Sequence, residues 1–136
     1  MSRFTLALIA HDSKKEELVV LAKTHREELA QLDLVATRST GTLIQARTGL
    51  SLTLMESGPH GGDQQIGALV AKGDVKAVIF LRDSLAAQAH EPDISALLRV
   101  CDVHNVSLAT NSATAESVLS YIAQQRSRAE FEPALV

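Results

Sequence analysis

Continuous apolar runs alternate with amphipathic stretches along this chain. Residues 4–10 and 76–81 are almost entirely apolar, which is typical of strands buried on both faces of a sheet. Shorter strand candidates lie at residues 34–37, 51–55 and 106–109. Between the strands, apolar residues recur at helical spacing, with glycine or proline at several boundaries. The predicted helices span residues 13–29, 40–48, 61–72, 92–104 and 114–126.

The order of these elements is a strand followed by a helix, repeated five times. This order predicts an α/β fold, a doubly wound three-layer sandwich with a five-stranded, mostly parallel sheet. We expect one domain over residues 1–127 and a C-terminal tail over residues 128–136. Ligands of such sheets bind at the carboxyl ends of the strands. The segments that follow the strands are therefore the place to look for function.

Composition narrows the class of partner. Aromatic residues make up only 3% of the 136 residues, so the core must be aliphatic. The net charge of −3 provides no general basic surface for nucleic acid. The single cysteine, Cys101, excludes an intrachain disulfide and fits a reducing compartment. The apolar run at residues 4–10 is too short to span a membrane and no signal peptide is evident, so we expect a cytoplasmic protein.

Every predicted strand-to-helix junction is polar. Serine, threonine, aspartate and asparagine often cap helices, and that ordinary role suffices for Ser112 and Thr114 and can extend to Asp12. It explains the full set less well, because a cap needs one residue and several junctions carry three or more polar groups. The candidates in chain order are His11, Asp12 and Lys15; Thr37, Arg38, Ser39 and Thr40; Ser57, Gly58 and Asp63; Asp83, His90 and Asp93; Thr110 and Asn111.

The second junction suits a phosphate group. The hydroxyls of Thr37, Ser39 and Thr40 and the N–H groups of a helix start are phosphate ligands, and Lys15 would add a positive charge. The pattern is not a Walker A loop, because no Gly-Lys-Ser/Thr follows the glycines. It is not a dinucleotide fingerprint either, since the first strand runs into His11 and Asp12 and not into Gly-x-Gly.

Metal and nucleophile patterns are poorly matched. His90 and Glu91 resemble the start of a zinc protease motif, but Ile94 occupies the place of the second histidine. Ser57 lacks the Gly-x-Ser-x-Gly elbow, and Cys101 falls in the middle of a predicted helix. We therefore expect neither a metal nor a covalent intermediate.

General acid–base chemistry fits the remaining residues better. Asp63, His90 and Asp93 come from two junctions, and the glycines around Asp63 would let a ligand approach the backbone closely. Two carboxylates near one phosphate would have shifted pKa values. This set favours proton abstraction beside the carbonyl of a small phosphate ester.

Three stretches resemble one enzyme family. "LIAHDSKK", "SGPHGGDQQIGALV" and "HEPDISALLRVCDVHNVSLATN" are similar to methylglyoxal synthases, and the resemblance extends over residues 6–121. It implies conversion of dihydroxyacetone phosphate to methylglyoxal and inorganic phosphate, without cofactor or metal. It also implies a doubly wound α/β domain, usually a homohexamer and often inhibited by phosphate.

The resemblance also implies roles for individual residues. Asp63 matches the family's catalytic base, and His90 matches the histidine that polarises the carbonyl side of the substrate. The other matches are the substrate-binding positions His11, Asp12 and Lys15, the phosphate-side Ser57 and Gly58, and the supporting carboxylates Asp83 and Asp93.

The chain departs from the family pattern at two positions. The phosphate loop that usually reads T-G-T-T-G has Arg38 in place of its first glycine, and Ser84 replaces a frequent proline. We expect the Arg38 side chain to point to solvent, with the alternative that it folds over the phosphate. A different class of function also stays open, an effector-binding module such as the one in carbamoyl phosphate synthetase, which would not need Asp63, His90 and Asp93 together.

Overall fold

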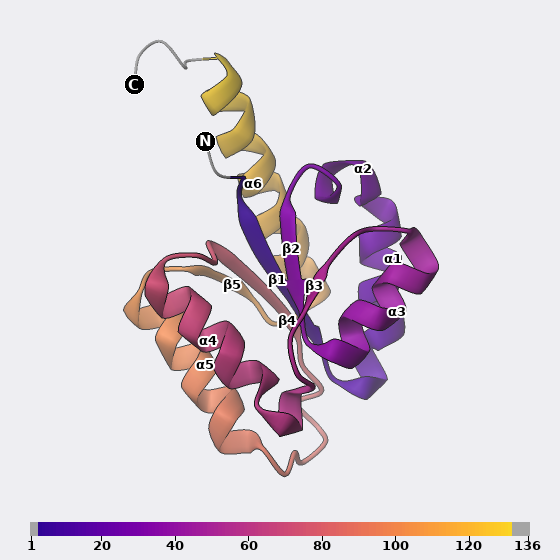
Figure 1. Ribbon diagram of the computed structural model, residues 1–136, viewed down its shortest axis with the longest axis vertical. Helices are drawn as coiled ribbons and strands as arrows, with labels where there is room; N and C mark the ends of the chain where they lie inside the picture. The colour runs from indigo at the N-terminus through magenta and orange to yellow at the C-terminus, as the bar shows by residue number, and fades with distance from the viewer. Residues whose placement is uncertain (1–2, 132–136) are drawn as a thin grey trace.

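The computed structural model describes residues 3–131 and contains a five-stranded sheet with helices on both sides (Figure 1). All strand pairs are parallel, and the strand order is β3-β2-β1-β4-β5. The predicted fold class is therefore confirmed. The strands are β1 (Thr5–Ala10), β2 (Asp33–Ala36), β3 (Thr53–Leu54), β4 (Ala77–Leu81) and β5 (Ser107–Ala109). The helices are α1 (Lys15–Thr24), α2 (Arg26–Leu29), α3 (Arg38–Thr48), α4 (Gly62–Lys72), α5 (Glu91–Val103) and α6 (Ser112–Phe131), with 3₁₀ turns at Asp12–Lys14 and Gly58–His60.

The two central strands, β1 and β4, are buried because both faces of the sheet are covered. Successive side chains of a strand point to opposite faces. Leu6 and Leu8 of β1 pack with α1, α3 and α6, whereas Ala7 and Ile9 pack with α4 and α5. The continuous apolar run at residues 4–10 is the sequence signature of this double burial.

Helix boundaries differ from the sequence-based expectation at three places. The helix predicted over residues 13–29 is a 3₁₀ turn followed by α1 and α2, and it breaks at His25, whose φ of −107° and ψ of 24° are not helical. Helix α3 begins at Arg38 and not at Thr40. Helix α6 continues to Phe131, so the first residues of the predicted tail are helical, and residues 132–136 lie outside the described part. No helix within residues 3–131 is long and apolar enough to cross a membrane.

The strand order creates a crevice between β1 and β4. From β1 the chain crosses by α1 to β2, while from β4 it crosses by α5 to β5 on the opposite side. The two connections leave the paired strands β1 and β4 in opposite directions. In doubly wound sheets, ligands bind at such a switch point. The junctions after β1 and β4 are those that carry His11, Asp83 and His90.

Candidate active site

A cavity of about 280 Å³ lies at the carboxyl edge of the sheet, where the switch point is. Its walls come from the segments that follow β1, β2, β3 and β4. Nine of the residues predicted from the sequence line it, which are His11, Asp12, Lys15, Thr37, Ser39, Gly58, Asp63, Asp83 and His90.

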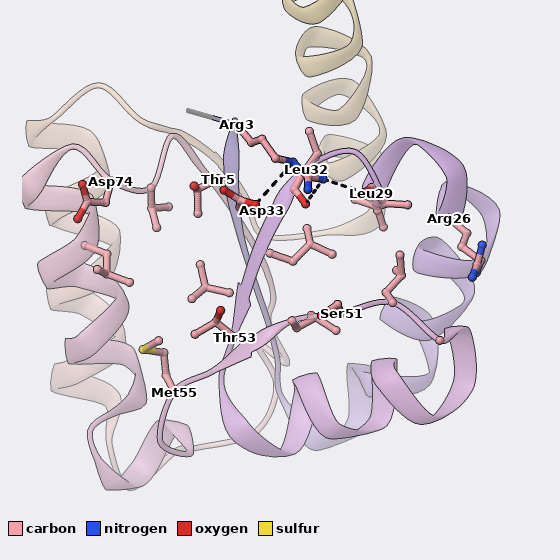
Figure 2. Close-up of a pocket in the computed structure, with 18 residues that line it drawn as sticks. Arg3, Thr5, Arg26, Leu29, Leu32, Asp33, Ser51, Thr53, Met55 and Asp74 are labelled. Atoms are coloured by element: carbon pink, nitrogen blue, oxygen red, sulfur yellow. Dashed lines mark hydrogen bonds and ion pairs between the residues drawn. The ribbon is translucent and has the colours of Figure 1, made fainter. Parts of the chain in front are cut away.

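A wider hollow of about 760 Å³ lies elsewhere, over β2 and β3 (Figure 2). Its charged groups are already paired within the protein. The side chain of Arg3 donates to the carbonyl of Leu32 and lies 3.6 Å from Asp33, and Arg26 donates to the carbonyl of Thr48. None of the predicted site residues lines this hollow. The chemistry is therefore concentrated at the smaller cavity.

Asp63 is placed by the tight entry into α4. Gly61 adopts a left-handed φ of 101°, and the N–H of Gly62 donates to the carbonyl of Ser57 at 2.9 Å. A Cβ atom on Gly62 would lie 2.0 Å from the carbonyl oxygen of Glu56, so only glycine fits there. These contacts set Asp63 in the first turn of α4 with its side chain pointing toward the cavity.

The carboxylate of Asp63 is fully buried, and neither of its oxygens accepts a hydrogen bond from any described residue. Burial raises the pKa of this carboxyl group, the nearby His90 lowers it, and Asp93 raises it further. A buried carboxylate without donors is a strong base toward a proton brought next to it.

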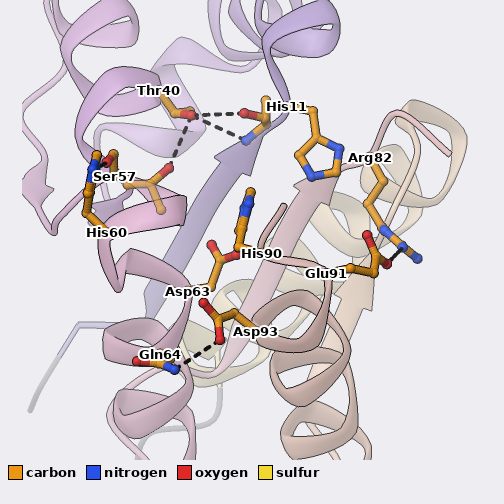
Figure 3. A network of polar contacts seen from close by, with 12 residues as sticks. His11, Thr40, Ser57, His60, Asp63, Gln64, Arg82, His90, Glu91 and Asp93 are labelled. Carbon is orange, nitrogen blue, oxygen red and sulfur yellow. Dashed lines mark hydrogen bonds and ion pairs between the residues drawn. The ribbon is translucent and has the colours of Figure 1, made fainter. Parts of the chain in front are cut away.

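His90 faces this carboxylate from the start of α5 (Figure 3). Its Nε2 atom lies 3.5 Å from Oδ2 of Asp63. A Cβ atom on Gly58 would lie 3.1 Å from the same Nε2 and 3.3 Å from Oδ1 of Asp63. The absence of a side chain at Gly58 therefore leaves open the space beside both groups, where a small substrate atom could sit.

His11 adds a second imidazole at the end of β1. The backbone N–H of Asp83 donates to its Nδ1 atom at 2.8 Å, so the neutral ring carries its proton on Nε2. Burial lowers the pKa of His11, as do the nearby His90 and Arg82. Within residues 3–131, the buried Nε2 atom has no hydrogen-bond partner. His11 is thus held as a neutral donor available to a ligand in the cavity.

The opposite wall carries groups suited to a phosphate. Thr37 directly precedes α3, and Ser39 lies in its first turn, so both line the cavity at the positive end of a helix dipole. The Nζ atom of Lys15 donates to Asp12 at 2.6 Å and to the carbonyl of Ala10 at 3.1 Å. The bond from Lys15 holds the pKa of Asp12 below its usual range. One ammonium is therefore fixed at the cavity wall by two oxygen partners.

Two residues of the second junction do not line the cavity. Arg38 is exposed, has ordinary helical backbone and places its Nε atom 3.6 Å from a carboxylate oxygen of Glu56. This is the solvent-facing arrangement expected from the sequence. Thr40 is buried behind the wall, where its hydroxyl accepts hydrogen bonds from the N–H of Ala10 and from Thr37.

Ser57 and Asp93 also stand outside the lining. The hydroxyl of Ser57 is hydrogen-bonded to Nδ1 of His60 at 2.6 Å. Asp93 accepts a hydrogen bond of 3.0 Å from the side chain of Gln64, the residue after Asp63. Neither side chain is therefore part of the cavity wall, although Ser57 directly precedes the lining residue Gly58 and the N–H of Asp93 donates to the carbonyl of the lining residue His90.

Several lining residues were not predicted from the sequence. Ser13 donates to Asp83 at 2.7 Å, and this bond is the main reason that the pKa of Asp83 is lowered. Gln88 lines the cavity from the loop between β4 and α5. Its position two residues before His90 was a signal that could have identified it. The remaining unpredicted members are Ile9, Ala10, Pro59, Phe80 and Ala86.

The acidic and histidine side chains of the site do not form a metal centre. Across residues 3–131 there is no group of three or more histidine, cysteine, aspartate or glutamate side chains that could hold a metal ion. The site instead combines one base, two imidazoles and one ammonium with hydroxyls at a helix start. Such a set is suited to proton transfer on a phosphorylated substrate.

Comparisons with known proteins agree with one another. The family model described as an MGS-like domain matches residues 17–110. The chain is 60% identical over 114 residues to a methylglyoxal synthase of Carboxydothermus hydrogenoformans, covering 84% of this chain and 94% of the relative. It is 53% identical over 133 residues to a methylglyoxal synthase of Cupriavidus pinatubonensis, covering 98% of this chain and 99% of the relative. The crystal structure of a methylglyoxal synthase from Elizabethkingia anophelis superposes with a TM-score of 0.82 at 43% identity, covering 87% of this chain and 78% of that one.

Proposed function

The chain belongs to the methylglyoxal synthase family, and on that premise we propose that it converts dihydroxyacetone phosphate to methylglyoxal and inorganic phosphate. The observation that carries this proposal is the buried carboxylate of Asp63, which has no hydrogen-bond donor and lies 3.5 Å from the imidazole of His90. A module that only bound a phosphorylated effector would gain nothing from an unpaired buried carboxylate, which costs free energy. An enzyme that removes a proton from carbon needs one.

The first step is proton abstraction by Asp63 from the hydroxymethyl carbon of the substrate. This carbon is the productive one, because the resulting enediolate keeps the phosphate ester on the neighbouring saturated carbon. Abstraction from the phosphate-bearing carbon would leave the ester on the double bond, from which it could not be expelled. His90 and the Nε2–H of His11 are suited to hydrogen-bond the carbonyl oxygen while negative charge builds on it.

The second step is elimination of phosphate. The carbon–oxygen bond to the phosphate breaks, its electron pair leaves with inorganic phosphate, and an enol aldehyde remains. That enol takes up a proton at its methylene carbon, loses the proton of its hydroxyl group and becomes methylglyoxal. Elimination requires the breaking bond to stand out of the enediolate plane, so the orientation of the phosphate is part of the chemistry. Thr37, Ser39 and Lys15 are the groups that would hold it.

One assay tests the proposal. The purified chain is incubated with dihydroxyacetone phosphate, and methylglyoxal and inorganic phosphate are measured in parallel. Equal amounts of the two products are expected, with no added cofactor or metal. Saturable binding of dihydroxyacetone phosphate without formation of either product would identify an effector-binding module instead.

Assembly and setting form part of the same proposal. We propose a homohexamer that is inhibited by its product phosphate and acts in the cytoplasm, as the family resemblance implies. The sheet ends in two edge strands, β3 and β5, and such open edges are places where copies of a chain could meet. A monomeric mass by light scattering at micromolar concentration would contradict the oligomer.

A further inference from the structure

Two glutamines follow the base directly, and their side chains tie the first turn of α4 to its surroundings. The Nε2 atom of Gln64 donates to Oδ1 of Asp93 at 3.0 Å. The Oε1 atom of Gln65 accepts from the backbone N–H of Glu56 at 2.7 Å. One bond therefore reaches α5, and the other reaches the segment that leads to Gly58.

The position of the Asp63 side chain depends on these hydrogen bonds of its neighbours, because its own carboxylate makes none with the described residues. No described residue donates a hydrogen bond to either of its oxygens, so its position follows from the backbone of α4. A carboxylate that must stay unpaired to act as a base cannot be anchored by its own side chain. The anchor has to come from neighbouring positions on the same helix turn.

The hydrogen bond from Gln64 to Asp93 is connected to His90 by a second hydrogen bond, made by the backbone of Asp93. Asp93 lies in the first turn of α5, and its backbone N–H donates to the carbonyl oxygen of His90 at 3.0 Å. Figure 3 shows Gln64 and Asp93 joined beside the facing pair of Asp63 and His90. The helices α4 and α5 also pack against each other along the same side of the sheet (Figure 1).

We propose that Gln64 is a positioning residue that sets the gap between Asp63 and His90 by holding Asp93. This inference rests on the proposed function, because the gap matters only if the two groups act on one substrate. Asp93 is then the anchor of Gln64 as well as a charge near the base. Since the contact fixes reacting groups and touches no part of the cavity wall that binds phosphate, its loss should lower kcat and leave KM nearly unchanged.

The first variant is Gln64→Met, which keeps the length of the side chain and removes the donor. We expect kcat for dihydroxyacetone phosphate to fall about tenfold, with KM and the inhibition constant of inorganic phosphate within about twofold of the parent. Gln45→Met is the matched control, because Gln45 also donates one side-chain bond, to the carbonyl of Leu52 at 3.2 Å, and does not line the cavity. The control should keep the parental kcat.

A second pair of measurements separates positioning from simple structural damage. Gln64→Glu turns the donor into an acceptor that repels Asp93, and it should also lower kcat about tenfold. In an enzyme that already carries Asp93→Asn, the new amide can donate a hydrogen bond to the carboxylate introduced by Gln64→Glu. Adding Gln64→Glu to that enzyme should therefore lower its kcat less than about twofold. Equal losses in the two backgrounds, or a loss confined to KM, would overturn the role of Gln64. A parent enzyme that forms no methylglyoxal would overturn the proposed function itself.

Discussion

Oδ2 of Asp63 and Nε2 of His90 lie 3.5 Å apart at the cavity. Among the described residues, no side chain or backbone group donates a hydrogen bond to either carboxylate oxygen of Asp63. The separation is too long for a strong hydrogen bond, and both groups border the same cavity. A substrate carbon and its neighbouring carbonyl oxygen could therefore contact the base and the imidazole together.

Asp63→Asn should abolish most of the turnover. The amide keeps the size of the side chain but does not accept a proton, and a positioned base contributes on the order of 10²–10⁴ in rate. We expect kcat to fall by about 10³-fold or more in an initial-rate assay, while binding of inorganic phosphate is retained. A variant that kept most of its turnover would remove Asp63 from the mechanism.

His90→Ala should lower kcat more than it raises KM. The oxygen that His90 contacts gains charge only in the transition state, and the loss of one such donor costs about 10²-fold or more in kcat. His90→Gln should be milder because its amide can still donate. A change confined to KM would point to a role in substrate binding alone.

Asp63→Asn should also change stability, with a sign that depends on pH. Burial raises the pKa of Asp63 in the folded state above its unfolded value, so the stability linked to this group is present at low pH and is lost as the pH rises through the folded pKa. The parent therefore loses stability as the pH rises, whereas the variant has no carboxylate at this position to ionise. The melting temperature of the variant should exceed that of the parent at pH 7, and the difference should shrink toward pH 4. An equal difference at both pH values would contradict the raised pKa.

Gly58→Ala should impair catalysis without disturbing the fold. The added methyl group would lie 3.1 Å from Nε2 of His90 and 3.3 Å from Oδ1 of Asp63, in the space that the substrate needs. Gly58 does not have a positive φ, so alanine can adopt its backbone. We expect kcat/KM to fall at least about tenfold with an unchanged circular dichroism spectrum.

Gly67→Ala is the control for that variant, since Gly67 lies in α4, the helix that follows the 3₁₀ turn of Gly58, and does not line the cavity. Its Cβ atom would lie 3.8 Å from Leu97, an ordinary contact. Alanine within a helix is more stable than glycine by up to about 1 kcal/mol. Activity should stay at the parental level, and a similar loss in both variants would show that any methyl group on this segment is harmful.

Arg38→Gly should leave substrate affinity nearly intact. The guanidinium pairs with Glu56 at the surface and does not line the cavity, so KM and inhibition by phosphate should stay within about threefold of the parent. A rise in KM of more than about tenfold, equivalent to ~1.4 kcal/mol of binding, would show that Arg38 contacts the phosphate.

The sequence was most informative where burial and periodicity coincide. The two central strands were predicted because double burial leaves an apolar run that cannot be confused with an exposed strand. The break at His25 was missed because neither glycine nor proline marks it. The start of α3 was placed two residues late, since Thr37, Ser39 and Thr40 are all residues that commonly cap helices.

The sequence predicted which strand-to-helix junctions form the candidate site, but it did not predict which side chains of each junction point into the cavity. Which side chain of a junction reaches the cavity depends on the phase of the following helix, and one residue changes that direction by about 100°. Ser39 therefore lines the wall, while Arg38 points outward and Thr40 packs beneath. The hydrogen bond between Gln64 and Asp93 joins two helices, and no local sequence pattern in either helix predicts it.

The C-terminal end of helix α6 is a suitable place to attach the protein to a solid support or to a fused protein. The residues that line the cavity all fall between Ile9 and His90, so β5 and α6 contribute none of them. Helix α6 follows β5 and ends at Phe131. In Figure 1 it runs back past the amino ends of the strands, away from the carboxyl edge of the sheet where the cavity residues lie. A solid support or a fused protein joined beyond α6 would leave the mouth of the cavity open to small molecules, which makes this end the natural anchor for an immobilised catalyst.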